Sequence, residues 1–149
     1  MDETRELYQE MILDHHKRPR NYGKLEQGLS SEGYNPLCGD RITVYILLDG
    51  ETIEDVKFEG SGCAICTASA SVMTDLLKGK TVTEAEELFG QFHDLVTGDP
   101  TETPETEGLG KMAVFCGVRE FPVRVKCATL AWHTLRAALE GKTEAISTE

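Results

Sequence analysis

A stripe of residues at intervals of four predicts a helix at the start of the chain. Over residues 3–16, Leu7, Met11 and His15 fall at this spacing, which brings side chains onto one helix face. The stretch KRPRNYG follows, and its proline and glycine end the helical pattern. We therefore expect the first element to be an amphipathic helix.

Two apolar, β-branched runs predict a hairpin in the first half of the chain. RITVYILLD (41–49) has the composition of a strand, and TIEDVKFEG (52–60) has that of a returning strand. Between them, Asp49-Gly50 is a hairpin turn signal. Residues 21–40 are rich in Gly, Ser, Asn and Pro, which predicts a loop with room for one short strand.

Helical periodicity returns after the hairpin. AICTASASVMTDLLKG (64–79) predicts a helix with small residues on one face, and Gly79 suits its end. Thr83 and Glu86 match the capping-box pattern, which predicts a further helix to about Val96.

The last third of the chain predicts two more helices. GKMAVFCGV (110–118) suits a short one, and FPVRVKCATLAWHTLRAALEGK (121–142) suits a longer one, with Pro122 in its first turn and Gly141 at its end. The expected order is a helix, a small antiparallel sheet and then helices. This order predicts the α+β class, with about three strands covered by helices in a single domain of residues 1–149.

The charge of the chain narrows the choice of partners. The formal net charge of −11 repels the phosphate backbone of nucleic acids, so no nucleic-acid partner is expected. The N-terminal MDETRELYQEM lacks the charged-then-apolar pattern of a secretory leader, and no apolar run has the length of a membrane span. We therefore expect a cytoplasmic protein with no membrane partner, in a compartment that keeps thiols reduced.

Five cysteines bring candidate chemistry into this picture: Cys38, Cys63, Cys66, Cys116 and Cys127. An odd number cannot all pair within one chain. Metal ligands, nucleophiles and core residues are therefore better interpretations than a disulfide framework.

Three of these cysteines lie where a thiolate is stabilised or can move. Cys63 lies between a strand end and a helix start, where unpaired backbone N–H groups and the helix dipole favour negative charge. Cys127 falls in the first turns of the last helix, close to basic residues. Cys38 lies in the loop NPLCGD, two residues before Asp40, whose carboxylate has metal-ligand chemistry.

Simpler interpretations of the cysteines remain open at this point. A cysteine is most often a small buried hydrophobe, which suits Cys116 and, in equal measure with chemistry, Cys66. The spacing Cys63-x-x-Cys66 matches a redox dithiol, but the predicted hairpin before it differs from the βαβ unit of a thioredoxin-like fold. A structural zinc site would need a second close Cys/His pair, and Cys116 and Cys127 are too far apart for that pattern.

Three motifs together resemble those of a known family. NPLCGD, GSGCAICTASASVMTDLLKGK and FPVRVKCATLAWHTL, in this order and spacing, are similar to the IscU/NifU N-terminal scaffold family of iron–sulfur cluster assembly, and more closely to its SufU branch. The resemblance covers nearly the whole chain, including LYQEMILDHHKRPRNYG. It implies an IscU-like fold of the SufE/NifU type, with a small antiparallel sheet covered by helices.

The resemblance also implies a metal site. The family's motifs place its site residues at these positions of the chain: Cys38, Asp40, Cys63 and Cys127. Cys66 and Cys116 fall at positions that the family does not require for its site.

Departures from IscU favour the SufU branch. Lys126 stands where IscU has a histidine before its third cysteine, and REFPVRVKC departs from the proline-rich chaperone motif of IscU. The segment between Cys63 and Cys127 is longer than in IscU and holds the acidic stretch TGDPTETPETEG, and an insertion here is a mark of SufU.

For function, the resemblance implies a partner of a SufS-like cysteine desulfurase. A SufU-like protein is similar to a zinc-dependent sulfurtransferase, which accepts persulfide sulfur and passes it towards downstream cluster assembly proteins. Our hypothesis is that Cys38, on its loop, leaves Zn²⁺ and attacks the outer sulfur. The alternative is an IscU-type scaffold that binds iron or a transient [2Fe–2S] cluster on the same cysteines. An alternative of another class is a structural zinc or thiol-redox module.

Overall fold

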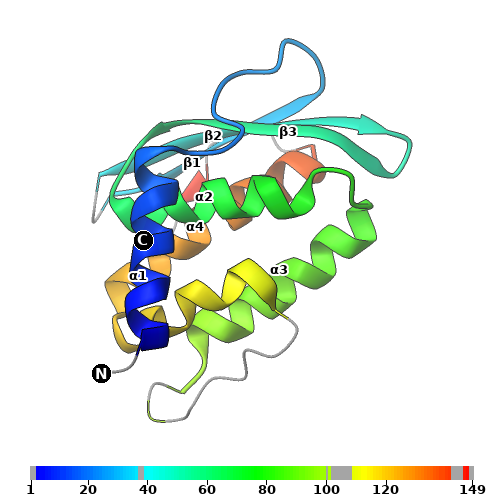
Figure 1. The fold of residues 1–149 in the computed structure, drawn as a ribbon. Helices are drawn as coiled ribbons and strands as arrows, with labels where there is room; N and C mark the ends of the chain where they lie inside the picture. The colour runs from blue at the N-terminus through cyan, green and yellow to red at the C-terminus, as the bar shows by residue number, and fades with distance from the viewer. Residues whose placement is uncertain (1–2, 37–38, 100, 102–108, 142–145, 148–149) are drawn as a thin grey trace.

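Most of the chain is described by the computed structural model (Figure 1). The residues outside the description are 1–2, 37–38, 100, 102–108, 142–145 and 148–149. Two predicted features lie outside the described residues: the candidate ligand Cys38 and most of the acidic stretch TGDPTETPETEG.

The described elements follow the predicted order of a helix, a sheet and further helices. In chain order they are α1 (Glu3–Lys17), β1 (Leu29–Asn35), β2 (Asp40–Asp49), β3 (Thr52–Ser61), α2 (Ala64–Leu77), α3 (Val82–Thr97), the 3₁₀ helix η1 (Gly110–Glu120), α4 (Pro122–Leu139) and β4 (Ile146–Ser147). Figure 1 shows the sheet as one layer, with α2 and α4 against one of its faces. On the far side of these two helices lie α3 and η1, and α1 packs against α2. The α+β prediction is confirmed.

In the described part of the chain, the sheet has the strand order β3-β2-β1-β4. The three longer strands are antiparallel, as predicted, and β4 adds a short parallel pairing to β1. The sequence pattern predicts a loop with room for one short strand over 21–40, but Leu29–Asn35 forms a strand of seven residues. The buried positions of this strand are Ser31, Gly33 and Asn35, so it lacks the apolar alternation that reveals a strand in a sequence.

Close packing of α4 on the sheet depends on Gly33. A Cβ at this position would lie 1.9 Å from Thr134 Oγ1, so only glycine lets α4 approach β1 this closely. On the neighbouring strand, Ile42, Val44 and Ile46 are buried and present an apolar face to the helices. These contacts fix α4, which carries one of the candidate ligands, relative to β1 and β2.

The capping box of α3 lies two residues earlier than the sequence analysis predicts. Thr81 Oγ1 accepts the Glu84 N–H at 3.1 Å, and Glu84 Oε1 accepts the Thr81 N–H at 3.0 Å. The predicted pair, Thr83 and Glu86, has the same spacing, so the pattern alone does not choose between the two frames. The prediction is wrong because Thr81 forms a β-bridge to the hairpin, which fixes where the chain leaves the sheet and enters the helix.

The turn between α2 and α3 is hydrogen-bonded to the start of β3. The Ile53 N–H donates to Lys80 O at 2.7 Å, and Ile53 O accepts the Gly79 N–H at 2.8 Å. The Val82 N–H donates to Glu51 O at 2.8 Å. Gly79 has a φ of +87°, a conformation that favours glycine after a helix end, as predicted. The direction of α3 is therefore set by the hairpin.

Small residues of α2 allow its neighbours to pack closely around it. Ala68, Ser69, Ala70 and Ser71 are all buried in this helix. Ser69 Oγ donates to Ala128 O of α4 at 2.5 Å. The backbones of α2 and α4 therefore lie within reach of one short side chain.

The predicted stripe of α1 is buried only towards the C-terminal end of the helix. His15 is 3% exposed, whereas Leu7 is 53% exposed. His15 Nδ1 and Ser71 Oγ are hydrogen-bonded at 2.7 Å, and Ser71 Oγ also accepts the Arg20 backbone N–H at 2.8 Å. Burial lowers the pKa of His15 below its ordinary value of 6.5, because desolvation disfavours the charged imidazolium.

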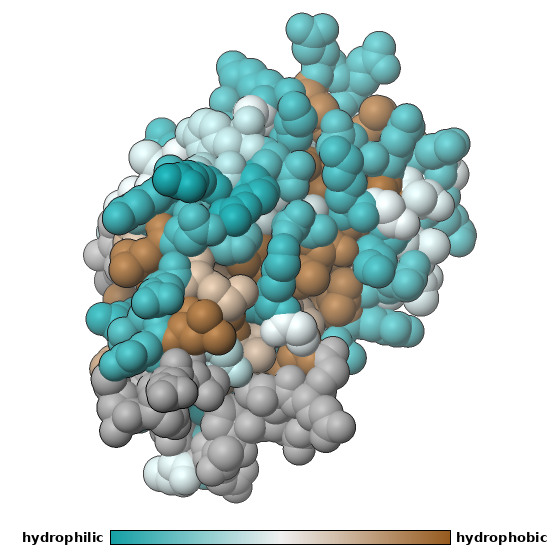
Figure 2. Space-filling view, in the orientation of Figure 1, coloured by the Kyte–Doolittle hydropathy of each residue, from teal (hydrophilic) through white to brown (hydrophobic). Residues whose placement is uncertain are grey.

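Aromatic side chains fill the space between α3, α4 and η1. Phe92 stacks on Trp132 with ring centroids 4.8 Å apart, and it meets Phe115 edge to face at 5.6 Å. Figure 2 shows hydrophilic residues over much of one face of the molecule and apolar residues gathered across its middle. Among the described helices, none has the length and apolar character needed to cross a membrane.

Candidate metal centre

Three candidate ligands from separate elements meet at one end of the sheet. Asp40 is the first residue of β2, Cys63 immediately precedes α2, and Cys127 lies in α4. One carboxylate oxygen and the two sulfurs all lie within 4.8 Å of one another. The fold thus brings together three of the predicted site residues, and the remaining one, Cys38, is outside the described part of the chain.

The carboxylate of Asp40 is oriented by a backbone N–H donor and fits in the space beside a glycine. Asp40 is fully buried, and its Oδ1 accepts the Cys63 N–H at 2.8 Å. Its Oδ2 lies 3.9 Å from Cys63 Sγ. A Cβ at Gly62 would lie 2.8 Å from Asp40 Oδ1, so the glycine leaves the space that the carboxylate occupies. The local sequence Gly62-Cys63 therefore both admits and orients Asp40.

Cys63 is the N-cap of α2. Its backbone is extended, with φ of −70° and ψ of 169°, and its Sγ accepts the Cys66 N–H at 3.4 Å. Backbone N–H groups and the helix dipole at this position stabilise negative charge on the sulfur, as the sequence predicts. Cys63 is half-buried, so its sulfur is the more accessible of the two that the structure places in the group.

Cys127 contributes a buried sulfur from α4. It is 1% exposed, and Asn35 Nδ2 lies 3.5 Å from its Sγ. Among the basic residues close to it in sequence, Arg124 places its guanidinium 4.6 Å from the ring centre of Phe121, at the exposed start of the helix. An amide donor, that of Asn35, therefore lies at this sulfur, and Arg124 is placed against the ring of Phe121.

Cys66 belongs to the core and not to the ligand group. It is 2% exposed and clusters with apolar residues of the core. Its backbone N–H donates to Cys63 Sγ at 3.4 Å. Cys116, in η1, is half-buried against the same core. The spacing Cys63-x-x-Cys66 therefore reflects the start of a helix, with one sulfur at the site and the other packed inside.

Asn35 is a further residue of the site that the sequence pattern does not reveal. This residue is fully buried, and its amide nitrogen lies 3.4 Å from Asp40 Oδ2 as well as near Cys127. It begins the motif NPLCGD, where an asparagine before proline indicates a turn. The signal that finds it is the pairing of β1 with β2, which sets Asn35 directly opposite Asp40.

The donor set fits a thiophilic metal ion. Sulfur ligands with one carboxylate suit Zn²⁺ or iron–sulfur chemistry and do not suit Mg²⁺ or Ca²⁺, which prefer oxygen. Burial adds to this argument, because Asp40 and Cys127 are 0% and 1% exposed. Ionised acids held so close and away from water repel one another, and a bound cation relieves that repulsion.

Comparison with known proteins places this site in a family. Residues 7–128 match the family model described as the NifU-like N terminal domain. The chain belongs to this family. The predicted IscU/NifU N-terminal membership is confirmed.

Proteins similar to this NifU-like chain are named for a zinc-dependent sulfurtransferase activity or for iron–sulfur cluster assembly. The chain is 45% identical over 129 residues to the zinc-dependent sulfurtransferase SufU of Bacillus subtilis, covering 87% of this chain and 86% of that protein. It is 42% identical over 134 residues to the iron–sulfur cluster assembly scaffold protein IscU of Streptococcus pyogenes, covering 90% and 83%. These two identities are similar, so likeness alone does not choose between the SufU and IscU branches.

The NifU-like fold extends to a more distant solved structure. The N-terminal part of a nitrogen-fixing NifU-like protein from Brucella abortus matches with a TM-score of 0.80 at 22% identity, covering 93% of this chain and 95% of that chain. At this identity the likeness bears on the fold alone, and it agrees with the predicted NifU-type architecture.

Proposed function

We propose that this protein is a zinc-dependent sulfurtransferase of the SufU type, which takes sulfur from a cysteine desulfurase for iron–sulfur cluster assembly. The observation that carries the proposal is the group of Asp40, Cys63 and Cys127, whose donor atoms lie within 4.8 Å of one another. Lys126 and the long segment between Cys63 and Cys127 favour the SufU branch, to whose B. subtilis member the chain is 45% identical over 129 residues.

In this proposal four residues hold Zn²⁺: Cys38, Asp40, Cys63 and Cys127. Three sulfurs and one oxygen match the preference of zinc for four ligands of this kind. Bound there, the ion supplies positive charge that keeps the thiols ionised at neutral pH. Asp40 is the hard donor among soft ones, so we expect it to be the weakest of the four donors.

Sulfur acceptance is assigned to Cys38. Only Gly39 stands between Cys38 and Asp40 in the sequence, and two peptide units span at most about 7 Å. The Cys38 thiolate attacks the outer sulfur of the desulfurase persulfide and forms a new S–S bond with it. The S–S bond of the desulfurase breaks, and its cysteine leaves as a thiolate. One thiolate replaces another, so the step needs no oxidant or reductant.

The other two cysteines suit the anchoring of a metal better than sulfur transfer. Cys127 is 1% exposed inside α4, so a persulfide on a partner protein has no direct path to it. Cys63 is tied to the start of α2 by the N–H bond that its sulfur accepts. Rigid elements therefore hold these two sulfurs in place, which leaves Cys38 as the cysteine that exchanges.

Delivery of a persulfide requires a protein partner, and the surface near the site has residues suited to one. Tyr34 and Phe121 are 39% and 44% exposed. Arg41 lies 5.5 Å from the ring centre of Tyr34, and Arg124 lies 4.6 Å from that of Phe121. Aromatic and arginine side chains are enriched in protein interfaces. We assign this surface to a SufS-like desulfurase in the cytoplasm, from which sulfur passes on to downstream cluster assembly proteins.

A second candidate function is an IscU-type scaffold. It is favoured by the 42% identity to IscU of S. pyogenes over 134 residues. The same cysteine thiolates suit iron, and a [2Fe–2S] cluster assembled on them would be cargo for other proteins. The two functions share the ligand positions and differ in the metal that occupies them.

Metal analysis separates these two functions. For protein purified without added iron, we expect about one zinc per chain and no visible absorbance. A brown protein with sulfur-to-iron charge-transfer bands would support the scaffold instead.

A persulfide-transfer assay tests the sulfurtransferase itself. The protein is mixed with a cysteine desulfurase and sulfur-labelled cysteine, and the label is located by mass spectrometry. Wild-type protein should carry it on Cys38, and Cys38→Ala should lose acceptance while keeping part of its metal. The matched control Cys66→Ala should keep both. Acceptance at the native rate by Cys38→Ala would refute the assignment, and zinc loss from Cys66→Ala would favour a Cys-x-x-Cys site. A wild type that accepts no label would indicate a structural zinc or thiol-redox module.

A further inference from the structure

The amide of Asn35 lies at the junction of two candidate ligands. Asn35 ends β1 directly opposite Asp40, the first residue of β2, and is fully buried. Its Nδ2 is 3.4 Å from Asp40 Oδ2 and 3.5 Å from Cys127 Sγ. One side chain therefore contacts a ligand from the sheet and a ligand from α4.

Charge decides which way the amide of Asn35 points. An asparagine NH₂ group has two hydrogens, one for each of the two acceptors here. Asp40 Oδ2 and Cys127 Sγ are both anionic when they bind a metal, so only the NH₂ end of the amide complements them. The reverse orientation would set a carbonyl oxygen against two negative charges.

The other end of the same amide shows that this arrangement has a cost. Asn35 Oδ1 is buried and has no hydrogen-bond partner within the described ranges. A buried acceptor without a partner is unfavourable, so a role in packing alone would be served better by an apolar side chain. The contacts of the NH₂ end give the reason for an amide at this position.

We propose that Asn35 is a positioning residue that presets Asp40 and Cys127 as a pair of metal donors and slows the release of the metal. The inference rests on the proposed function, because it takes both residues as ligands. With the amide in place, the carboxylate and the sulfur are oriented before the metal arrives, so less order has to be created on binding. The N–H bond to sulfur also draws electron density away from Cys127.

The experiment compares Asn35→Leu with wild type and with a control on the same strand. Leucine has the same number of heavy side-chain atoms and the same branching as asparagine but is larger, so it removes both donors and leaves no space for a water molecule to replace them. Ser31→Ala is the matched control, because Ser31 is another buried polar residue of β1 whose Oγ has no partner in the described residues. Each protein is loaded with Zn²⁺, and release to excess chelator is followed.

Release from Asn35→Leu should be about tenfold to a hundredfold faster than from wild type, as is common when a partner of a metal ligand is removed. Ser31→Ala should stay within about twofold of wild type. A second readout uses Co²⁺, whose thiolate charge-transfer band reports on the sulfur. Loss of the N–H bond should move this band to longer wavelength in Asn35→Leu, which a purely structural role of Asn35 would not do.

The outcomes distinguish the role of Asn35 from the proposed function of the protein. Wild-type release rates and an unshifted cobalt band in Asn35→Leu would overturn the role of Asn35. If that variant does not fold, Asn35→Ala is measured in the same way, with folding checked by circular dichroism in the metal-free state. A wild type that holds zinc but accepts no sulfur would refute the proposed function, while the release rates still decide the role of Asn35. A wild type that holds neither metal would refute both.

Discussion

Gly62 shows how a missing side chain shapes the candidate metal centre. A Cβ here would lie 2.8 Å from Asp40 Oδ1 and 3.2 Å from its Cγ. Asp40 is fully buried and already accepts the Cys63 N–H, so the carboxylate cannot move aside without losing that bond. Gly62 is outside the set of glycines with positive φ. Space, and not backbone conformation, is therefore the reason for this glycine.

We predict that Gly62→Ala weakens zinc binding about tenfold to a hundredfold, because the methyl group displaces the carboxylate of Asp40, which we propose as a ligand. Competition with a chromophoric chelator measures the affinity. The matched control is Gly90→Ala in α3, where a Cβ meets nothing within 4 Å. The control should bind zinc as wild type does and gain about 0.5–1 kcal/mol of stability from the helix. Native affinity in Gly62→Ala would show that Asp40 contributes little to metal binding.

At the residue scale, the sequence predicts donors better than it predicts their supports. Asp40, Cys63 and Cys127 are predicted as ligands from the family resemblance of their motifs, and the structure brings the three together. Asn35 is not predicted, because its role depends on lying opposite Asp40 once β1 is paired, and β1 itself is hard to detect. Cys66 is ambiguous in the sequence for a related reason: whether a thiol points to a site or to the core is decided by the start of the helix.

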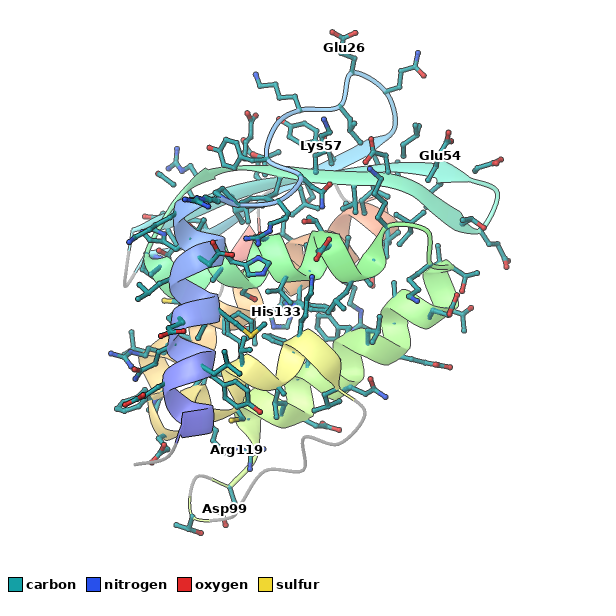
Figure 3. The ribbon with its side chains drawn as sticks, in the orientation of Figure 1. Glu26, Glu54, Lys57, Asp99, Arg119 and His133 are labelled. Atoms are coloured by element: carbon teal, nitrogen blue, oxygen red, sulfur yellow. The ribbon has the colours of Figure 1, made fainter. Side chains whose placement is uncertain are left out.

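At the element scale, a side chain of η1, Arg119, caps the C-terminus of α3. Arg119 Nε and Nη2 donate to Leu95 O at 2.9 and 2.7 Å, and Nη1 donates to Asp99 O at 3.3 Å. Figure 3 shows Arg119 and Asp99 close together near one end of the molecule. A Cβ at Gly98 would lie 2.5 Å from Arg119 Nη2. The guanidinium thus supplies hydrogen-bond donors to the carbonyl groups that a helix leaves unpaired at its C-terminus.

We predict that Arg119→Ala lowers the free energy of unfolding by about 1.5–3 kcal/mol, the range for charged hydrogen bonds. Arg119→Lys should recover only part of this, because one ammonium group cannot reproduce the planar fork. Urea unfolding followed by circular dichroism gives the values. Lys24→Ala is the control, since its ion pair with Glu59 is 3.8 Å long, exposed at the lysine and worth about 1 kcal/mol or less. Equal losses in both variants would indicate a general effect of charge and not a helix cap.

The contact between α1 and α2 should be sensitive to pH through His15. Burial holds its pKa below the ordinary value of 6.5, and the positive charges of Arg20 and Lys111 add to this effect. The unfolded chain therefore binds the proton more readily than the folded one. The contribution of His15 to stability is complete above about pH 6.5 and is lost as the pH falls through the lowered pKa of the folded state.

We predict that the free energy of unfolding falls less for His15→Gln than for wild type when the pH is lowered from 7.5 to 5.5. Glutamine keeps a hydrogen-bonding side chain near Ser71, and each pH is about one unit from the ordinary histidine pKa. Urea unfolding of the metal-free proteins at the two pH values measures this. Part of the dependence should remain, because burial also lowers the pKa of His133 on α4. Identical pH dependence in the variant and wild type would assign the whole effect to other groups.

The predicted elements differ in how well their sequences reveal them. The sequence predicts α1, α2 and α4 because apolar periodicity and end signals such as Pro122 agree with each other. The strand β1 is not revealed in this way, since small and polar residues fill its inward face under α4. The start of α3 depended on a β-bridge at Thr81, which is a contact between distant parts of the chain.

At the scale of the whole molecule, the candidate centre joins β2, α2 and α4. These elements also meet through the core, where Gly33 and Ser69 allow close approach. A ligand that binds only the folded state adds stability according to its concentration relative to its Kd. Zinc should therefore act as a further tie between elements that are already packed.

We predict that removing zinc lowers the free energy of unfolding by about 4 kcal/mol relative to protein with free zinc at about 1,000 times its Kd. The loss should be local at first, so amide hydrogen exchange should rise most at Cys63 and Cys66, whose N–H groups contact Asp40 and the Cys63 sulfur. Calorimetry and exchange measured with and without chelator test the two parts. Uniform exchange over all elements would mean that the metal does not act through this end of the sheet.

The attachment of the α2–α3 turn to β3 has a consequence for protein engineering. The Asp49-Gly50 turn is exposed, and a Cβ at Gly50 meets nothing within 4 Å, which makes it an obvious place to insert a reporter domain. Yet Glu51 and Ile53, just beyond the turn, are hydrogen-bonded through their backbones to the segment that leads into α3. An insertion that spreads the hairpin would therefore pull on a helix in another layer of the molecule. A fusion at this turn would report on the docking of α3 as well as on the sheet.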